Sequence, residues 1–272
     1  MGYGLADLRT KGGLVREWGM GVLSLKGFWI LITTIVLVNS VPVHAGGDKK
    51  EDLPKIATAT KDQVKILEQF QARLTGAGQV KAELKRKTVI GLLGQEKLAS
   101  GELLLSKGRV RMDLKTPETE ERHLLVVGSK AFWAVTYPPT DLEGALVQVV
   151  TGPVKSKKSA STGFLAILGK DGFLKSFSVS GVSLDNDGGI RYYLQPKADW
   201  VEAKRALLAL GPELGKSKKT SVRDFREIKI WDSLDNETQF TLGDVKFSKE
   251  EADAGKFDFK PPKNADVMTV PQ

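Results

Sequence analysis

The sequence predicts a mainly β protein with a few α-helices: an incomplete antiparallel β-barrel, which is a curved sheet, covered by a lid of short helices. Segments of alternating apolar and polar residues recur along the chain, and residues 109–115 alternate at every position. Short connections with turn residues separate these segments, as antiparallel neighbours require. Three other segments have helical spacing or form brief apolar runs, so they are available to cover the apolar face.

The N-terminal region is typical of a secretory signal peptide. A basic residue, Lys26, precedes an apolar run at 28–38, and Val43-His44-Ala45 supplies a peptidase site. The run is shorter than the roughly 20 residues that span a bilayer. We therefore expect a periplasmic protein, with a retained signal anchor as the alternative. Translation starts at Met1 or, because residues 1–19 precede the basic region, at Met20.

Three regions follow from this interpretation. Residues 1–45 are the N-terminal extension and signal peptide, residues 46–60 are a polar and flexible tether, and residues 61–272 are a single domain. The domain opens with a helix predicted over 61–74, for which the Thr60 hydroxyl is a suitable N-cap. The apolar stripe of this helix would face the sheet.

The remaining elements are mainly strands. A turn at 185–188 has the acidic residues but not the spacing of a calcium loop, so we interpret it as a plain turn. Further helices are expected at 164–168 and 199–210, from an apolar run and from helical spacing. The predicted strands are 79–88, 98–106, 109–115, 123–127, 131–137, 146–150, 173–182, 189–195, 225–231, 238–245 and 256–260.

Composition excludes several classes of function. The chain has no cysteine, so it has neither a lipid-anchoring cysteine nor disulfides, and of its two histidines only His123 follows the leader. A zinc site would need several of these residues, and a catalytic triad would need His123 itself. We interpret His123 as an exposed residue at a strand end and expect no enzyme, metal or cofactor. The net charge of +8 suits anionic lipid surfaces or solubility, and no nucleic-acid motif is present.

An apolar sheet face covered by amphipathic helices is either a packed core or a lipid pocket that packing leaves incomplete. Alternation and helical spacing select the side chains expected to face inward. The candidate lipid-binding residues are Val64, Leu67, Phe70, Val110, Met112, Leu114, Val126, Phe132, Trp133, Phe164, Leu168 and Leu194.

Several motifs resemble the outer-membrane lipoprotein carrier family, LolA. The strand and proline at 108–117 are similar to the family pattern G-R-F-R-W-E-Y-x-x-P. The apolar strand and hairpin at 124–133 resemble its G-K-x-L-W element and precede Tyr137-Pro138. Residues 193–197 and 257–262 resemble its L-x-P-K and F-x-F-x-P-P elements. The match is loose but collinear over nearly the whole chain after the leader.

The resemblance implies a LolA/LolB-like half-barrel whose cavity shelters the acyl chains of lipoproteins crossing the periplasm. It implies an acylated lipoprotein or other lipid cargo, an inner-membrane transporter that releases it, an outer-membrane LolB-like acceptor, and a monomeric carrier. The alternative is a divergent module of the same fold that binds lipid or senses envelope proteins without carrying lipoproteins.

The chain departs from the family pattern where an arginine helps to hold the lid shut. Leu105, Ser106 and Lys107 occupy the places of Lys-Arg-Pro, so Ser106, Lys107 and Arg109 become the candidate lid contacts. Because lysine lacks the fork of donors that arginine has, this departure predicts a lid that opens more easily. Residues 199–220 are also longer and more helical than the corresponding family connection.

Overall fold

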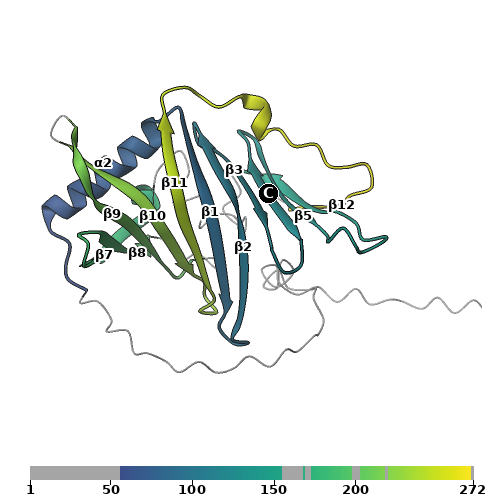
Figure 1. Ribbon diagram of the computed structural model, residues 1–272, viewed down its shortest axis with the longest axis horizontal. Helices are drawn as coiled ribbons and strands as arrows, with labels where there is room; N and C mark the ends of the chain where they lie inside the picture. Colours follow the sequence, from purple (N-terminus) through teal and green to yellow (C-terminus); the bar gives the residue numbers. More distant parts are fainter. Residues whose placement is uncertain (1–55, 155–167, 169–172, 198–202, 218–219, 271–272) are drawn as a thin grey trace, which may run out of the picture. The chain divides into compact units, whose positions relative to one another are not determined.

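One sheet of twelve strands dominates the part of the chain that the computed structural model describes, which is residues 56–154, 168, 173–197, 203–217 and 220–270 (Figure 1). The strand order is β12-β6-β5-β4-β3-β2-β1-β11-β10-β9-β8-β7, and all neighbours are antiparallel except β12 and β6. Because β12 and β7 are edges that do not pair with each other, the sheet is open, as the sequence predicts. The predicted leader and residues 46–55 of the predicted tether lie outside the described residues.

The strand bounds agree with the predicted alternation over the first half of the chain. In chain order, the strands are β1 (Gln79–Ile90), β2 (Gln95–Ser106), β3 (Arg109–Lys115), β4 (Arg122–Val127), β5 (Ala131–Tyr137), β6 (Gln148–Pro153), β7 (Phe177–Leu184), β8 (Ile190–Pro196), β9 (Arg205–Ser217), β10 (Thr220–Trp231), β11 (Glu237–Ser248) and β12 (Asp266–Thr269).

Two α-helices and one 3₁₀ turn accompany the sheet in the described residues: α2 (Lys61–Gly76), α4 (Phe173–Ser176) and η2 (Ala254–Phe257). The predicted cap of α2 is confirmed. The Thr60 hydroxyl accepts a hydrogen bond from the Gln63 amide at 3.3 Å, and the Gln63 side chain accepts one from the Thr60 amide at 2.8 Å. This reciprocal pair satisfies two backbone donors at the helix start and fixes where the helix begins.

The two faces of the sheet carry separate apolar clusters, because successive side chains of a strand point to opposite faces. The first face, which we call the helix face, packs against α2 and α4. The second, which we call the tail face, is covered over β2–β6 by the C-terminal segment 249–265, drawn in yellow in Figure 1. The tail-face cluster contains Leu104, Leu124, Val126, Val135, Val149, Ala252 and Phe257.

The helix predicted over 199–210 is wrong where the structure describes it, because residues 205–210 begin β9. Positions 206–210 are all buried, since β9 lies between β8 and β10 and is covered on both faces. A continuous apolar run of this kind cannot be told from a buried helix by periodicity alone. Most of the longer 199–220 region is therefore an arm of the β9–β10 hairpin.

Two other element predictions also need correction. Residues 173–176 form the short helix α4 rather than the start of a strand, and β7 begins only at Phe177. The predicted strand at 256–260 is a 3₁₀ turn followed by extended chain, because this segment lies across the tail face instead of joining the sheet. The twelfth strand is β12, which the sequence analysis did not predict.

The end of the predicted tether is held by the sheet. Ala57 and Val182 exchange two backbone hydrogen bonds of 2.8 Å, which join residue 57 to the edge strand β7. Gly181 makes this approach possible, because a β-carbon at that position would overlap the Ile56 side chain. Ala57, near the end of the predicted tether, is therefore bonded to the edge of the sheet.

Candidate lipid-binding hollow

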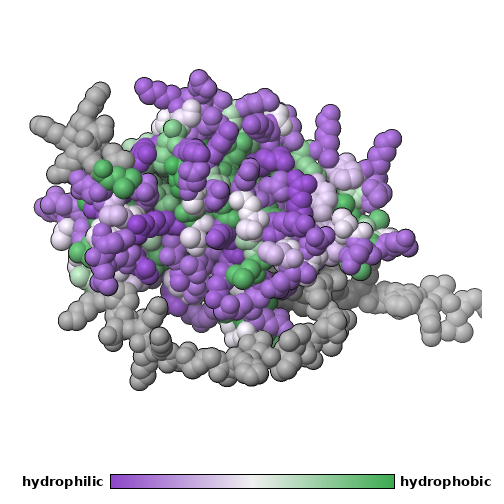
Figure 2. Space-filling model, viewed as in Figure 1, coloured by the Kyte–Doolittle hydropathy of each residue, from purple (hydrophilic) through white to green (hydrophobic). Residues whose placement is uncertain are grey.

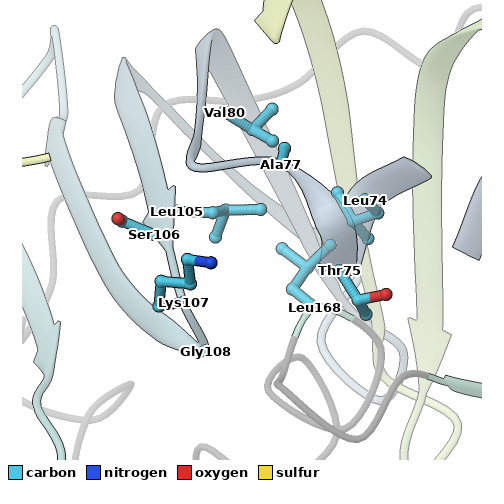
Figure 3. Close-up of a pocket in the computed structure, with 9 residues that line it drawn as sticks. All are labelled: Leu74, Thr75, Ala77, Val80, Leu105, Ser106, Lys107, Gly108 and Leu168. Atoms are coloured by element: carbon cyan, nitrogen blue, oxygen red, sulfur yellow. The ribbon is translucent and has the colours of Figure 1, made fainter. Parts of the chain in front are cut away.

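A hollow of about 310 Å³ lies between the C-terminal end of α2 and the turn that joins β2 to β3 (Figure 3). Five apolar lining residues belong to or pack against the helix-face cluster, so the hollow borders the core, and polar groups form much of the remaining lining. Thr75 and Lys107 are the polar side chains at its rim. The lining residues are Leu74, Thr75, Ala77, Val80, Leu105, Ser106, Lys107, Gly108 and Leu168.

The hollow exists because α2 is fixed to the other half of the sheet. The Tyr192 hydroxyl on β8 donates a hydrogen bond of 2.8 Å to the Gln63 carbonyl, and Phe70 packs edge-on against Phe225 of β10 at 5.1 Å between ring centroids. The amide of Leu174 donates to the Gln71 side chain at 2.8 Å, which joins α4 to α2. The helix is thus held over β8–β10, and its last turn stands beside β1–β3 without filling the space there.

The rim on the strand side is a two-residue β-hairpin turn. Lys107 and Gly108 have φ values of 51° and 76°, which is the pattern of a type I′ turn and matches the twist of the strands. Figure 3 shows the Lys107 side chain reaching toward the hollow. Its ammonium group lies 3.6 Å from the Glu251 carboxylate and half of the side chain is exposed, so this cation is available to a second anion.

Ser106 is a structural contact and not a lid contact, which corrects the sequence-based prediction. Its side chain is buried, and Figure 3 shows the hydroxyl pointing away from the hollow. The hydroxyl donates to the Gly78 carbonyl at 2.7 Å and accepts from the Ala252 amide at 3.2 Å. Ser106 therefore joins the start of β1 to the C-terminal segment.

Arg109 also lies on the wrong face to hold a helical lid. Its guanidinium stacks on the Phe257 ring at 4.6 Å from the centroid, and its Nε donates to the Ser106 carbonyl at 3.3 Å. Both partners belong to the tail side of the sheet. Of the three candidate lid contacts, only Lys107 reaches the hollow with its side chain.

The structure places most of the predicted cavity residues on the helix face, where they pack together. Leu168 is the one among them that lines the hollow. Val64 of α2 is half-buried outside this cluster, and Phe164 lies outside the described residues. The candidates in the helix-face cluster are Leu67, Phe70, Val110, Met112, Leu114, Phe132, Leu168 and Leu194.

Val126 and Trp133 face the opposite way, so their assignment to the cavity is wrong. The two residues pair across β4 and β5, and both pack in the tail-face cluster. Val127 and Phe132 are the neighbouring pair that points to the helix face. In a strand that is buried on both faces, successive apolar residues point alternately to the two faces. A continuous apolar run therefore does not reveal which residues face the helices.

Sequence analysis missed the apolar residues that line the hollow with Leu168: Leu74, Ala77, Val80 and Leu105. Leu74 lies in the predicted helix over 61–74 and Val80 in the predicted strand over 79–88. Their apolar character indicated that they face the core but did not indicate that they border a hollow. The signal that could have indicated Leu105 was the turn at 107–108. Because β2 ends at Ser106, just before this turn, Leu105 lies close to the rim.

A polar group lies on the helix face at the far end of β1 and β4. The Arg86 guanidinium is buried, which lowers its pKa to about 10 although the Glu121 carboxylate raises it, so it stays protonated at neutral pH. His123 is mostly buried rather than exposed, which corrects the prediction. Burial, and then the charges of Arg86 and Lys97, lower the pKa of His123 to about 4.

The His123 ring has polar neighbours on both sides. Its Nδ1 lies 3.5 Å from the Thr136 hydroxyl and its Nε2 lies 3.7 Å from the Glu121 carboxylate. Because its lowered pKa keeps the ring neutral, the contact with Glu121 is polar rather than ionic.

Neither a metal centre nor a membrane-spanning helix is found in the described residues. No three His, Cys, Asp or Glu side chains there come together as a metal ion would require. None of the helices in the same residues is long and apolar enough to cross a membrane.

Comparison with known proteins finds likeness in structure only. No protein-family model matches the chain, and no curated protein matches its sequence. Similar solved structures include a DUF1329 family protein from Desulfovibrio piger, 10% identical with a TM-score of 0.38, covering 74% of this chain and 98% of that one. An uncharacterized conserved protein from Thermus thermophilus is 14% identical with a TM-score of 0.42, covering 77% and 100%.

A third similar structure, from Vibrio parahaemolyticus, is described as a putative outer membrane lipoprotein-sorting protein domain. It is 11% identical with a TM-score of 0.37, covering 71% of this chain and 95% of that one. Because the identities and TM-scores are this low, these three likenesses assign no function to the chain.

Proposed function

We propose that this protein is a non-enzymatic lipid carrier that holds an acyl chain in the hollow between α2 and the β2–β3 turn. The observation that carries the proposal is the hollow itself: about 310 Å³, with an apolar side that continues into the core and one exposed cation at the rim. Ligand pockets in proteins occupy roughly 300 to 1,000 Å³, so this hollow suits one chain rather than several.

The physical chemistry of the hollow fits this cargo. Each methylene moved from water into an apolar site contributes about 0.8 kcal/mol, so an apolar hollow can compete with a membrane for an acyl chain. The buried wall residues Leu74, Val80 and Leu105 supply that surface. Lys107 at the rim would meet an anionic head group or the charged end of the cargo.

The finer proposal follows the sequence resemblance to the LolA family. In it, the cargo is the acylated end of a lipoprotein, which an inner-membrane transporter releases and an outer-membrane acceptor receives across the periplasm. The proposal is supported by the family-like motifs, the predicted secretory leader and the open sheet covered by helices. A same-fold lipid-binding module without lipoprotein cargo would share the hollow but fail in lipoprotein transfer.

The test is binding of a fluorescent fatty acid by the purified protein. Ala77→Trp should abolish binding, because the indole would enter the hollow from its rim. Ala72→Trp is the matched control, since Ala72 is exposed on α2, which ends just before Ala77, and does not line the hollow. Equal binding by both variants would refute the proposed site, and no binding by the wild-type protein would refute the carrier.

A transfer experiment tests the finer step. Acylated lipoprotein is offered to the protein, and its retention in solution without detergent is followed by size-exclusion chromatography. Retention that Ala77→Trp abolishes supports lipoprotein cargo. Fatty-acid binding without retention of lipoprotein would identify the alternative lipid-binding module instead.

A further inference from the structure

Exposed leucines gather at the end of the sheet that lies farthest from the hollow. Leu92 and Leu93, in the turn between β1 and β2, are 85% and 65% exposed, and Leu234, in the turn between β10 and β11, is 53% exposed. Two more exposed leucines, Leu142 and Leu146, lie in the connection after β5, which runs toward the same end. The face shown in Figure 2 is mostly hydrophilic, with hydrophobic residues in small separate patches.

The first two of these turns are neighbours. The Gly91 amide donates a hydrogen bond of 3.1 Å to the side-chain carbonyl of Asn236, and Val89 of β1 pairs with Glu237 of β11 (Figure 1). Leu92, Leu93 and Leu234 therefore project from adjacent hairpin ends. We call these three residues the leucine tip.

Hydrogen bonds hold the leucine tip in its exposed position. One Asp232 carboxylate oxygen accepts from the amides of Leu234 and Asn236 at 2.8 and 2.9 Å, and the other accepts from the Asn236 side chain at 2.9 Å. In the first turn, the Leu93 amide donates to the Ile90 carbonyl at 3.0 Å. The leucines are thus presented by well-formed turns, and each costs about 1.5–3 kcal/mol relative to burial.

Three acidic side chains beside the leucine tip are paired with cations, whereas Asp232 is bound by the neutral donors described above. Glu96 lies 2.6 Å from Lys87, Asp235 lies 3.1 Å from Lys204, and Glu237 lies 3.3 Å from Lys229. These pairs reduce local repulsion of an anionic surface. The net charge of +8 on the whole chain adds a long-range attraction to such a surface.

We propose that the leucine tip is a membrane-contact surface that inserts into the head-group region of a bilayer containing anionic lipid. The tip consists of the ends of two adjacent hairpins, so a fluid bilayer can close around it, whereas a protein partner would need a matching concave site. The hollow lies at the other end of β1, roughly 35–40 Å away for a strand of this length. Contact through the tip leaves the mouth of the hollow in water.

Vesicle flotation tests the proposal with vesicles of phosphatidylethanolamine and phosphatidylglycerol. The protein is recovered from producing cells and its N-terminus is identified by mass spectrometry, so that all variants are compared in one form. The double variant Leu92→Asp/Leu93→Asp should partition onto vesicles about a hundredfold less, because each of the two lost leucine burials is worth a factor of roughly ten.

The matched control is Leu184→Asp/Leu214→Asp, which carries the same change in charge. These leucines are 62% and 60% exposed and lie toward the opposite end of the sheet, so partition should be unchanged. Equal partition of the wild-type protein and the leucine-tip variant would overturn the proposal. Failure of the wild-type protein to bind vesicles would also overturn it. So would the finding that the wild-type and control proteins are dimers whereas the leucine-tip variant is a monomer.

The proposal is independent of the hollow, and the same variants show this. The leucine-tip variant should bind the fluorescent fatty acid as the wild-type protein does, and Ala77→Trp should still float with vesicles. Loss of fatty-acid binding in the leucine-tip variant would mean that its fold had changed. Flotation of the milder variant Leu92→Ser/Leu93→Ser would then be the test of the membrane contact. Unchanged flotation of that folded variant would overturn the membrane contact.

Discussion

The Ser106 hydroxyl donates a hydrogen bond of 2.7 Å to the Gly78 carbonyl. The same oxygen accepts from the Ala252 amide at 3.2 Å, so one side chain joins the end of β2, the residue before β1 and the C-terminal segment. The three segments are far apart in sequence, and the hydroxyl is buried where they meet. This contact supports both the wall of the hollow and the cover of the tail face.

Ser106→Ala should lower the free energy of unfolding by about 1–3 kcal/mol, because it leaves a buried amide and a buried carbonyl without their partner. Urea denaturation followed by tryptophan fluorescence measures the change. Ser129→Ala, at an exposed turn position, is the control and should be neutral. An equally neutral Ser106→Ala would show that water or a rearranged backbone replaces the hydroxyl.

Ser106→Arg should prevent folding rather than slow the release of cargo, since no space exists for a guanidinium at this buried position. This expectation reverses the one that follows from aligning Ser106 with the family's lid arginine. A soluble, folded Ser106→Arg protein, observed by circular dichroism, would contradict it.

Lys107→Asn should have two effects of opposite sign. Asparagine tolerates the positive φ of 51° better than lysine, so unfolding should become less favourable by about 0.5–1 kcal/mol. Binding of a fluorescent fatty acid should weaken, because the cation at the rim is lost. Thermal denaturation and fluorescence titration measure the two effects.

Lys130→Asn is the control for charge, because Lys130 lies in the exposed β4–β5 turn and does not line the hollow. It should leave fatty-acid affinity unchanged. Equal affinities of Lys107→Asn and the wild-type protein would show that the Lys107 ammonium group does not meet the head group, while the apolar walls could still hold the chain.

Much of the fold could be predicted because neighbouring strands are also neighbours in sequence. Val110, Met112 and Leu114 alternate with charged residues, and the structure places all three on the helix face. The prediction was wrong at Leu207 and Leu208, where burial on both faces of β9 removes the alternation that identifies a strand. The local sequence pattern identifies a strand only where one face of that strand is exposed to solvent.

The candidate site was harder to predict because it depends on contacts that are distant in sequence. Ser106 was interpreted from its place in a motif, but its partners Gly78 and Ala252 decide its role. The hollow arises where the end of α2 fails to cover Val80 and Leu105. No local pattern reports how far a helix extends over a sheet.

Tyr192→Phe should loosen α2 without unfolding the protein. It removes the 2.8 Å hydrogen bond from the phenol to the Gln63 carbonyl, which is worth about 0.5–1.5 kcal/mol. Hydrogen exchange should become faster in the first turns of α2, while β1–β3 keep their protection. Tyr193→Phe is the control, because the Tyr193 hydroxyl lies near Ser183 and makes no contact with the helix. Equal exchange rates in α2 for both variants would mean that packing of Leu67 and Phe70 alone holds the helix.

His123 should make stability depend on pH between about 6.5 and 4. Burial holds its pKa near 4 in the folded protein, whereas the unfolded chain has the ordinary value of 6.5. The unfolded state therefore binds more protons in this window, and folding stability falls as the pH falls. A difference of this size corresponds to at most about 3 kcal/mol, fully present above pH 6.5 and lost by about pH 4.

The variant His123→Gln isolates this contribution, since glutamine keeps a polar side chain beside Thr136 and Glu121 without titrating. Urea unfolding at pH 7 and at pH 5 gives the measurement for both proteins. The wild-type protein should lose more stability than the variant between the two values, because carboxylates common to both proteins cancel in the comparison. An identical loss in the two proteins would mean that water reaches the ring and that its pKa in the folded state is close to 6.5.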